Sequence, residues 1–238
     1  MSAKKTGVKE IKNGDPAIEI LIDGLHKSFD GKHVLRGIDL DIRRNSIVAI
    51  VGGSGCGKTV LLNHILGLLE PDQGRVQVSD HDQDGEPLVD LADLDENQMA
   101  NIHMHWGVVF QNNALFSGSV YDNIALWLSE TRNMEIEEIE PIARKVLDAV
   151  SLSSDKDFLN LDVHDLSGGM AKRLALARAL AMNPQVIFYD EPTTGLDPTS
   201  AAQVHDLIVT THEQFMDNGH NRSEEHTSEL QSRPHLVC

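Results

Sequence analysis

The sequence predicts an α/β fold, in which a core of apolar strands and helices is interrupted by a helical insert. Two nearly continuous apolar runs, at residues 46–52 and 185–191, are typical of strands covered on both faces. Two earlier segments, at 18–25 and 35–42, alternate apolar and polar residues and therefore predict half-buried strands. From about 112 to 165 the pattern is helical and acidic, which predicts a helical subdomain.

The remaining elements are bounded by residues that start or stop regular structure. In chain order they are a turn at 29–33, a helix over 58–69 stopped by Glu70-Pro71, a short strand at 75–80, an acidic loop-like stretch over 80–98, a helix over 168–182 stopped by Asn183-Pro184, and a helical stretch over 200–216. Strand, glycine loop and helix therefore follow one another directly in the first half of the chain.

Composition restricts the class of protein. Hydrophobic residues make up 40% of the 238 residues and charged residues 24%, which is ordinary for a globular chain. The net charge of -17, without a dense Lys/Arg stripe, argues against nucleic acid as a partner. Only two cysteines, Cys56 and Cys238, argue against a disulfide framework. No apolar run approaches the roughly 20 residues of a membrane span and the start of the chain lacks a secretion signal, so we expect a cytoplasmic location.

A glycine-rich loop follows the first buried strand and matches the P-loop pattern of Gly, four residues and Gly-Lys-Thr. Its glycines let successive backbone amides point toward phosphate groups, and the following helix adds its positive end. Lys58 is expected to contact the β and γ phosphates of ATP, and the Thr59 hydroxyl to coordinate Mg²⁺. The alternative is a glycine-rich turn without a ligand. The residues expected to bind nucleotide here are Gly52, Gly53, Ser54, Gly55, Cys56, Gly57, Lys58 and Thr59.

Two acids end the second buried strand. Asp190 is placed to hold Mg²⁺ directly or through water, and Glu191 to polarise the attacking water as a general base. Taken alone, two acids at a strand end are more often solvated charge. After a P-loop, the catalytic interpretation is favoured.

Six sequence elements then occur in one characteristic order. They are Phe29, the P-loop, Gln111 after an apolar strand, LSGGM at 166–170, the Asp190-Glu191 pair, and GLDP at 195–198. Over roughly residues 18–215 the chain therefore resembles the ATP-binding cassette (ABC) ATPases. Each motif alone is weak, whereas the ordered set is highly specific. The resemblance implies a P-loop NTPase cassette with a RecA-like core, an antiparallel β subdomain and a helical insert.

The resemblance also explains why one small ATPase carries two phosphate-binding turns. It implies that two cassettes pair head to tail as a homodimer, with each ATP between the P-loop of one copy and the LSGGM signature of the other. Ser167, Gly168 and Gly169 would then grip the γ-phosphate of the partner's ATP. The alternative for this turn alone is a helix N-cap with flexible glycines.

Three further roles are implied by the resemblance. Phe29 would stack on adenine, although it could instead be an ordinary core residue. Gln111 would belong to the catalytic and metal-binding set, as a sensor of Mg²⁺ and γ-phosphate that faces the transmembrane partner. Asp197 would make a contact across the dimer.

The signature ends in Met170, where ABC ATPases usually have Gln. Together with the sequence that follows Gln111, this methionine is similar to the ATPase subunit of Mla/Mce-type lipid transporters. The resemblance then implies a motor subunit on the inner face of the membrane, working with permease subunits, an Mce-type lipid-binding protein and a lipid cargo. The alternatives are an importer of another solute, a non-transport ABC ATPase in DNA repair or at the ribosome, and a nucleotide-gated binding module without turnover.

The switch histidine of ABC ATPases is not recognisable. His212 lies too close to Glu191 and within a helical stretch, while His226 has a better spacing but lies in RSEEHTSELQS, at 222–232. That segment matches the translation of a sequencing-library adapter, so we expect it to be read-through rather than native sequence. A disordered, acidic native tail is the alternative. We therefore expect a natural chain that continues beyond about Asn221, and we expect the present one to hydrolyse ATP poorly if at all.

These expectations define three regions of the chain. Residues 1–17 form an N-terminal extension, residues 18–221 an ABC ATPase domain that is incomplete at its C-terminus, and residues 222–238 the suspected read-through.

Overall fold

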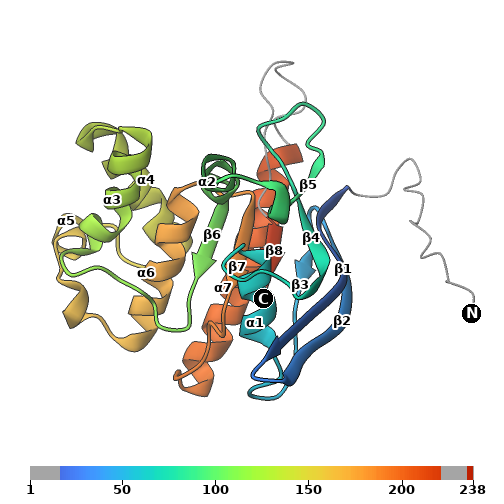
Figure 1. The fold of residues 1–238 in the computed structure, drawn as a ribbon. Coiled ribbons are helices and arrows are strands. Elements are labelled where there is room, and N and C mark those ends of the chain that lie inside the picture. Colours follow the sequence, from blue (N-terminus) through green and yellow to red (C-terminus); the bar gives the residue numbers. More distant parts are fainter. Residues whose placement is uncertain (1–16, 221–234, 238) are drawn as a thin grey trace, which may run out of the picture.

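The computed structural model describes residues 17–220 and 235–237. Figure 1 shows three regions: an antiparallel sheet at one side, a parallel sheet in the middle, and a group of helices at the other side.

The antiparallel sheet has the strand order β2-β1-β4-β5. β1 (Ile18–Phe29) and β2 (Lys32–Arg43) form a hairpin around Asp30 and Gly31, which both have positive φ, as a tight two-residue hairpin turn requires. β4 (Gln73–Ser79) pairs with β1, and β5 (Leu88–Asp90) pairs with β4. The stretch over 80–98 was expected to be an acidic loop, but it contains β5. This strand forms because its residues pair with the edge of β4, as Val89 does with Val78.

The parallel sheet has the strand order β3-β8-β7-β6. Its strands are short: β3 (Ile47–Val48), β6 (Trp106–Val109), β7 (Val186–Tyr189) and β8 (His235–Val237). β8 lies within the suspected read-through segment, and its Leu236 pairs with both Ile47 and Ile187. The adapter-like residues 222–232 and His226 lie outside the described residues.

Helix α1 (Lys58–Ile65) packs between the two sheets. Its buried Leu61, Leu62 and Ile65 share one core cluster with strand residues of both sheets, among them Phe188. The helix is shorter than the predicted 58–69, because Gly67 adopts φ 69° and the Leu68 amide bonds back to the Asn63 carbonyl at 2.8 Å. This left-handed glycine cap satisfies the last carbonyls and ends the helix.

The helical region follows β6 and is built from five elements. These are α3 (Val120–Arg132), α4 (Ile136–Ala149), α5 (Lys156–Leu159), the 3₁₀ turn η2 (Val163–Asp165) and α6 (Gly168–Ala181). Their apolar faces form a second core cluster, to which Ile187 and Tyr189 of β7 also belong. β7 therefore presents alternate side chains to two cores, which accounts for its continuous apolar sequence.

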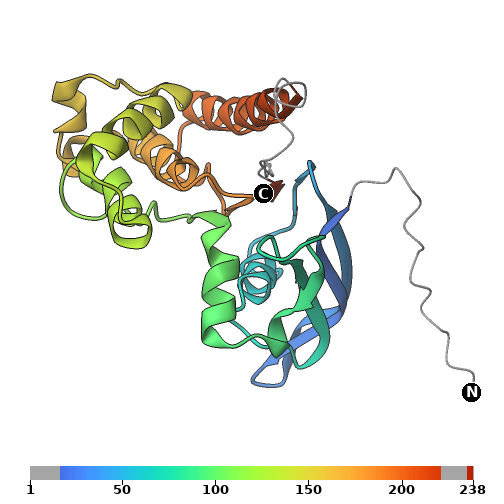
Figure 2. The same ribbon diagram turned by 90° about the horizontal axis from the view of Figure 1, so that it is seen from above.

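The two remaining helices flank the parallel sheet. α7 (Pro198–His220) lies on the side of the helical region, and α2 (Glu96–Met104), which follows the 3₁₀ turn η1 (Leu91–Asp93), lies on the side of the antiparallel sheet (Figure 2). α2 was not predicted from the sequence, although Asp95 and Gln98 form a capping box at its start.

Within residues 17–220 and 235–237, no helix combines the length and the apolar character needed to cross a membrane.

Candidate functional site

The glycine loop joins β3 to α1. Gly55 and Gly57 adopt φ 75° and 102°, backbone conformations that side chains with a Cβ rarely tolerate. A Cβ added to Gly52 would lie 2.4 Å from the Cys56 sulfur. The loop therefore closes on itself tightly, and its glycines are required by the backbone path rather than by flexibility alone.

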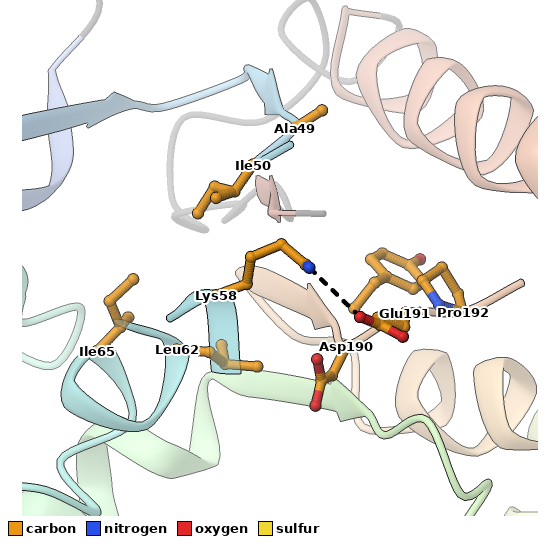
Figure 3. Close-up of a pocket in the computed structure, with 9 residues that line it drawn as sticks. Ala49, Ile50, Lys58, Leu62, Ile65, Asp190, Glu191 and Pro192 are labelled. Carbon is orange, nitrogen blue, oxygen red and sulfur yellow. Dashed lines mark ion pairs between the residues drawn. The ribbon is translucent and has the colours of Figure 1, made fainter. Parts of the chain in front are cut away.

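Lys58 is the first residue of α1, and its ammonium group folds back over the loop. Nζ lies 3.0 Å from the Gly52 carbonyl oxygen and 3.4 Å from that of Gly53. It also forms an ion pair with Glu191 Oε1 at 3.5 Å, drawn in Figure 3. The cation is thus held at the mouth of the loop, beside a carboxylate that arrives from β7.

Asp190 comes directly after β7, and its amide still bonds to the Val109 carbonyl of β6 at 2.9 Å. The sheet therefore fixes its backbone position. Its carboxylate accepts a hydrogen bond from the Thr59 hydroxyl, with 3.5 Å between Thr59 Oγ1 and Asp190 Oδ1. Two hard oxygen donors from separate elements thus lie side by side.

These donors fit Mg²⁺, which prefers oxygen ligands and usually takes only one or two carboxylates, leaving the rest to phosphate and water. Among residues 17–220 and 235–237 there is no cluster of three or more His, Cys, Asp or Glu side chains that could hold a metal ion. A site with one carboxylate and one hydroxyl is therefore suited to a metal that arrives with a nucleotide.

Glu191 adopts φ 48°, in the left-handed region that a non-glycine residue rarely occupies. Its carboxylate lies between two partners: Lys58 Nζ and the Thr194 hydroxyl, which donates to Glu191 Oε2 at 3.0 Å. Strained residues of this kind cluster at functional sites, where the surrounding structure over-determines them.

A pocket of about 190 Å³ opens where these residues meet. Figure 3 shows Lys58 and Glu191 pointing toward one another, with Asp190 next to Glu191. The apolar part of its lining comes from the residues that follow β3, from α1, and from the end of β7 and the proline after it. The lining residues are Ala49, Ile50, Lys58, Leu62, Ile65, Tyr189, Asp190, Glu191 and Pro192.

The second predicted phosphate-binding turn lies elsewhere in the chain. Ser167 caps α6 by accepting the Met170 amide at 3.3 Å, and Gly168 and Gly169 approach Leu196 and Ser200. No residue of 166–170 lines the pocket around Lys58 in the described part of the chain. Within one copy, the two turns therefore do not share a pocket.

Asp197 caps α7. Its carboxylate accepts the amides of Thr199 and Ser200 at 3.0 and 3.1 Å and the Ser200 hydroxyl at 2.6 Å. The Ser200 hydroxyl, followed by the backbone amides, holds the pKa of Asp197 below its usual value. The structure therefore gives Asp197 a local role, while its predicted contact across a dimer stays a prediction.

Phe29 and Gln111 lie at the ends of their strands. The Phe29 side chain is 42% exposed at the end of β1, with Lys27 Nζ 5.7 Å from its ring centroid, so it is not a core residue. Its open ring face leaves adenine stacking as a prediction. Gln111 follows β6 at the same sheet edge as Asp190, and its described contact is at its backbone carbonyl, which accepts Lys172 Nζ at 3.0 Å.

Lys172 and Arg178 were not predicted from the sequence as functional residues; both lie on α6, where Lys172 contacts Gln111 and Arg178 contacts the two residues Asn113 and Ala114. A signal was present: both interrupt a helix otherwise rich in Ala and Leu, and Lys172 is only 7% exposed. Long cationic side chains in an apolar helix face require a partner for their charged ends.

His212 lies on α7, apart from the pocket lining, as its place in a helical stretch predicted. It is buried, and its Nδ1 has no hydrogen-bond partner among the described residues. Burial lowers the pKa of His212, with a smaller opposing effect from Glu213. The position is that of a packed helix residue.

Comparison with known proteins gives a consistent set of matches. Residues 35–194 match the sequence model of the family described as ABC transporter. Protein TRIGALACTOSYLDIACYLGLYCEROL 3, chloroplastic, of Arabidopsis thaliana is 36% identical over 204 residues, covering 82% of this chain and 56% of the relative. The probable ribonucleotide transport ATP-binding protein mkl of Mycobacterium leprae (strain TN) is 37% identical over 200 residues, covering 83% and 54%. The chain thus spans about half the length of these curated relatives.

Two solved structures share the fold. One is cbiO1 from Clostridium perfringens, described as part of the ABC transporter complex cbiONQ, with a TM-score of 0.73, 27% identity, and coverage of 93% of this chain and 78% of that chain. The other is the ATP-binding cassette MJ0796, in a dimeric post-hydrolysis state bound to ADP and Pi, with a TM-score of 0.70, 27% identity, and coverage of 92% and 86%. These matches confirm the predicted cassette fold.

Proposed function

Because the chain belongs to the ABC transporter family, among its ATP-binding subunits, we propose that it binds ATP with Mg²⁺ and hydrolyses it as one half of a nucleotide-sandwich dimer. The supporting observation is the convergence of the P-loop and the end of β7. Lys58 lies 3.5 Å from Glu191, and Thr59 lies 3.5 Å from Asp190. A cation, a base and Asp190 of the metal-binding pair therefore line one pocket, and Thr59 lies beside Asp190.

Each of these residues has a part that its chemistry suits. The loop amides and Lys58 bind the β and γ phosphates. On nucleotide binding, the Lys58 ammonium group therefore gives up its contacts with the Gly52 carbonyl and Glu191 and contacts the phosphates instead. Thr59 and Asp190 hold Mg²⁺, which neutralises charge on the phosphates when bound. Glu191, once released by Lys58, orients the attacking water and accepts its proton. Phe29 stacks on the adenine with its exposed face.

The signature turn completes the site of a second copy. Ser167, Gly168 and Gly169 begin α6, where unpaired amides and the positive helix end attract an anion. Since this turn lines no part of its own Lys58 pocket, we assign it to the γ-phosphate of the nucleotide on the partner. The dimeric state in which the cassette MJ0796 was solved supports this arrangement. ATP then joins two copies until hydrolysis removes the bridging phosphate.

We further propose that the dimer drives transport by separate membrane subunits, at the inner face of the membrane. The structure named cbiO1 is part of a transporter complex, which supports a permease partner. A lipid cargo and an Mce-type partner are the finer part of this proposal. The chloroplast relative is named after a diacylglycerol lipid, whereas the mycobacterial one is described as a probable ribonucleotide transport protein.

Nucleotide binding by two single variants tests the ATP site. Lys58→Ala should weaken the affinity for MgATP at least about tenfold, because it removes charge-assisted hydrogen bonds to phosphate. Lys145→Ala, which removes an exposed lysine of α4, is the matched control and should leave the affinity unchanged. Titration calorimetry measures both. Equal affinities of Lys58→Ala and the wild type would refute the proposed phosphate role.

A further inference from the structure

Two cations of α6 hold the backbone of the segment that contains Gln111. Lys172 Nζ donates to the Gln111 carbonyl at 3.0 Å. Arg178 donates to the Ala114 carbonyl at 2.7 Å and to the Asn113 carbonyl at 3.2 Å. The Arg178 guanidinium also lies 5.3 Å from the ring centroid of Phe116. The segment 111–116 is thus attached to one helix at several successive points.

Packing alone does not require a charge at position 172. Lys172 is 7% exposed, and among the described residues its ammonium group has no carboxylate within ion-pair distance. Burying a cation without a counter-charge costs free energy, and burial indeed lowers the pKa of Lys172. A methionine could fill similar space without this cost. What the ammonium group adds is its hydrogen bond to Gln111.

The segment is also strained where Arg178 holds it. Ala114 adopts φ 47°, a left-handed conformation that is unfavourable for a residue with a Cβ. Such a conformation persists only where surrounding contacts impose it. The Arg178 bond to the Ala114 carbonyl is a contact of that kind.

We propose that Lys172 is a positioning residue for Gln111, and that with Arg178 it fixes segment 111–116 to α6. The inference rests on the proposed ATP site and on the role that the family resemblance implies for Gln111, a sensor of Mg²⁺ and γ-phosphate. The N-terminus of α6 carries Ser167. α6 and the attached segment therefore form one rigid unit, which contains Ser167, directed at the partner's nucleotide, and the backbone that positions Gln111 at the chain's own nucleotide. When the dimer closes around one ATP, the movement of α6 is thereby transmitted to Mg²⁺ binding at the other ATP.

The attachment itself is tested without nucleotide. In Lys172→Met, deuterium uptake of the peptide spanning 111–117 should become about tenfold faster, while the melting temperature stays the same or rises because a buried charge is lost. Lys172→Arg, which can still donate to the carbonyl, should restore the wild-type rate. Lys145→Met is the control for a Lys-to-Met change at an exposed position. Unchanged uptake in Lys172→Met would overturn the proposal.

A second experiment tests whether Lys172 acts through Gln111. It measures ATP affinity with Mg²⁺ and with EDTA in its place, and the ratio of the two is the gain that Mg²⁺ provides. Lys172→Met should reduce this gain about tenfold and leave the affinity in EDTA unchanged. In a Gln111→Ala background, Lys172→Met should have no further effect, because both act through one side chain. Effects that multiply would show that Lys172 does not act through Gln111. If Gln111→Ala leaves the gain intact, the metal-sensing role expected of Gln111 fails, whereas the exchange measurement still decides whether Lys172 holds the segment.

Discussion

Thr59 Oγ1 lies 3.5 Å from Asp190 Oδ1, although the two residues are 131 positions apart in the chain. β3 and β7 lie in the same parallel sheet, with β8 between them, so both strands end at the same edge of the sheet. The residues after each strand consequently meet there. This one contact joins the phosphate-binding loop to the acids that we propose act on the nucleotide.

Glu191→Gln should preserve ATP binding and remove hydrolysis. The wild-type carboxylate competes with phosphate for Lys58, so its neutralisation should tighten MgATP binding by about two- to fivefold. Binding is measured by titration calorimetry and residual hydrolysis by phosphate release. Weaker binding, or hydrolysis equal to that of the wild type, would contradict the role of Glu191.

Alkylation of Cys56 should block nucleotide binding. The thiol is free and exposed within the loop, and its sulfur lies against Gly52. A group added to the sulfur would therefore occupy the space in which the loop is proposed to bind phosphate. MgATP should protect the thiol from iodoacetamide. Mass spectrometry measures the labelled fraction, and Cys56→Ser controls for reaction at other positions. Equal labelling with and without MgATP would rule the idea out.

Stability should fall as the pH drops from about 7.5 to 5.5, in part through His212. Burial lowers the pKa of His212 below the usual 6.5, so below that pH the unfolded chain binds a proton that the folded chain does not. Protonation therefore favours unfolding. In His212→Leu the fall in unfolding free energy across this range should be smaller. Urea titrations at a series of pH values give the comparison, and identical slopes would exclude His212 as a cause.

Phe188→Ala should destabilise the fold by about 3–5 kcal/mol, because the ring is fully buried in the cluster between the sheets and leaves a cavity. Chemical denaturation measures the loss. Val209→Ala, at an exposed position of α7, is the control and should change stability by less than about 0.5 kcal/mol. A loss below about 1 kcal/mol at Phe188 would show that this core is not packed as described.

Much of this arrangement follows from local sequence. The apolar strand before Gly52 and the one before Asp190 could be recognised because strands covered on both faces are apolar throughout, and the motifs at their ends placed the candidate site. The acidic stretch at 80–98 was different. It contains β5 and the start of α2, whose formation depends on pairing with β4 and on a capping box rather than on an apolar pattern.

The attachment of Gln111 to α6 could not be predicted in the same way. It consists of side chains that bond to backbone carbonyls more than sixty positions away, as in the Arg178 bond to Ala114, so no local pattern specifies the partner. Likewise, the early end of α1 depends on one glycine in a left-handed conformation, which apolar periodicity does not register.

A mixing experiment shows whether each ATP is enclosed by two copies of the chain. Lys58→Ala removes the phosphate contact of a copy's own site, while Ser167→Arg blocks the clamp it offers to its partner. Neither variant alone should dimerise with MgATP in a Glu191→Gln background, because both sites of each homodimer are defective. A heterodimer of the two variants has one intact site, formed by the P-loop of the Ser167→Arg copy and the signature turn of the Lys58→Ala copy. Size-exclusion chromatography of the mixture should therefore show an MgATP-dependent heterodimer. A mixture that stays monomeric, while the Glu191→Gln chain alone dimerises, would refute the enclosure of ATP by two copies.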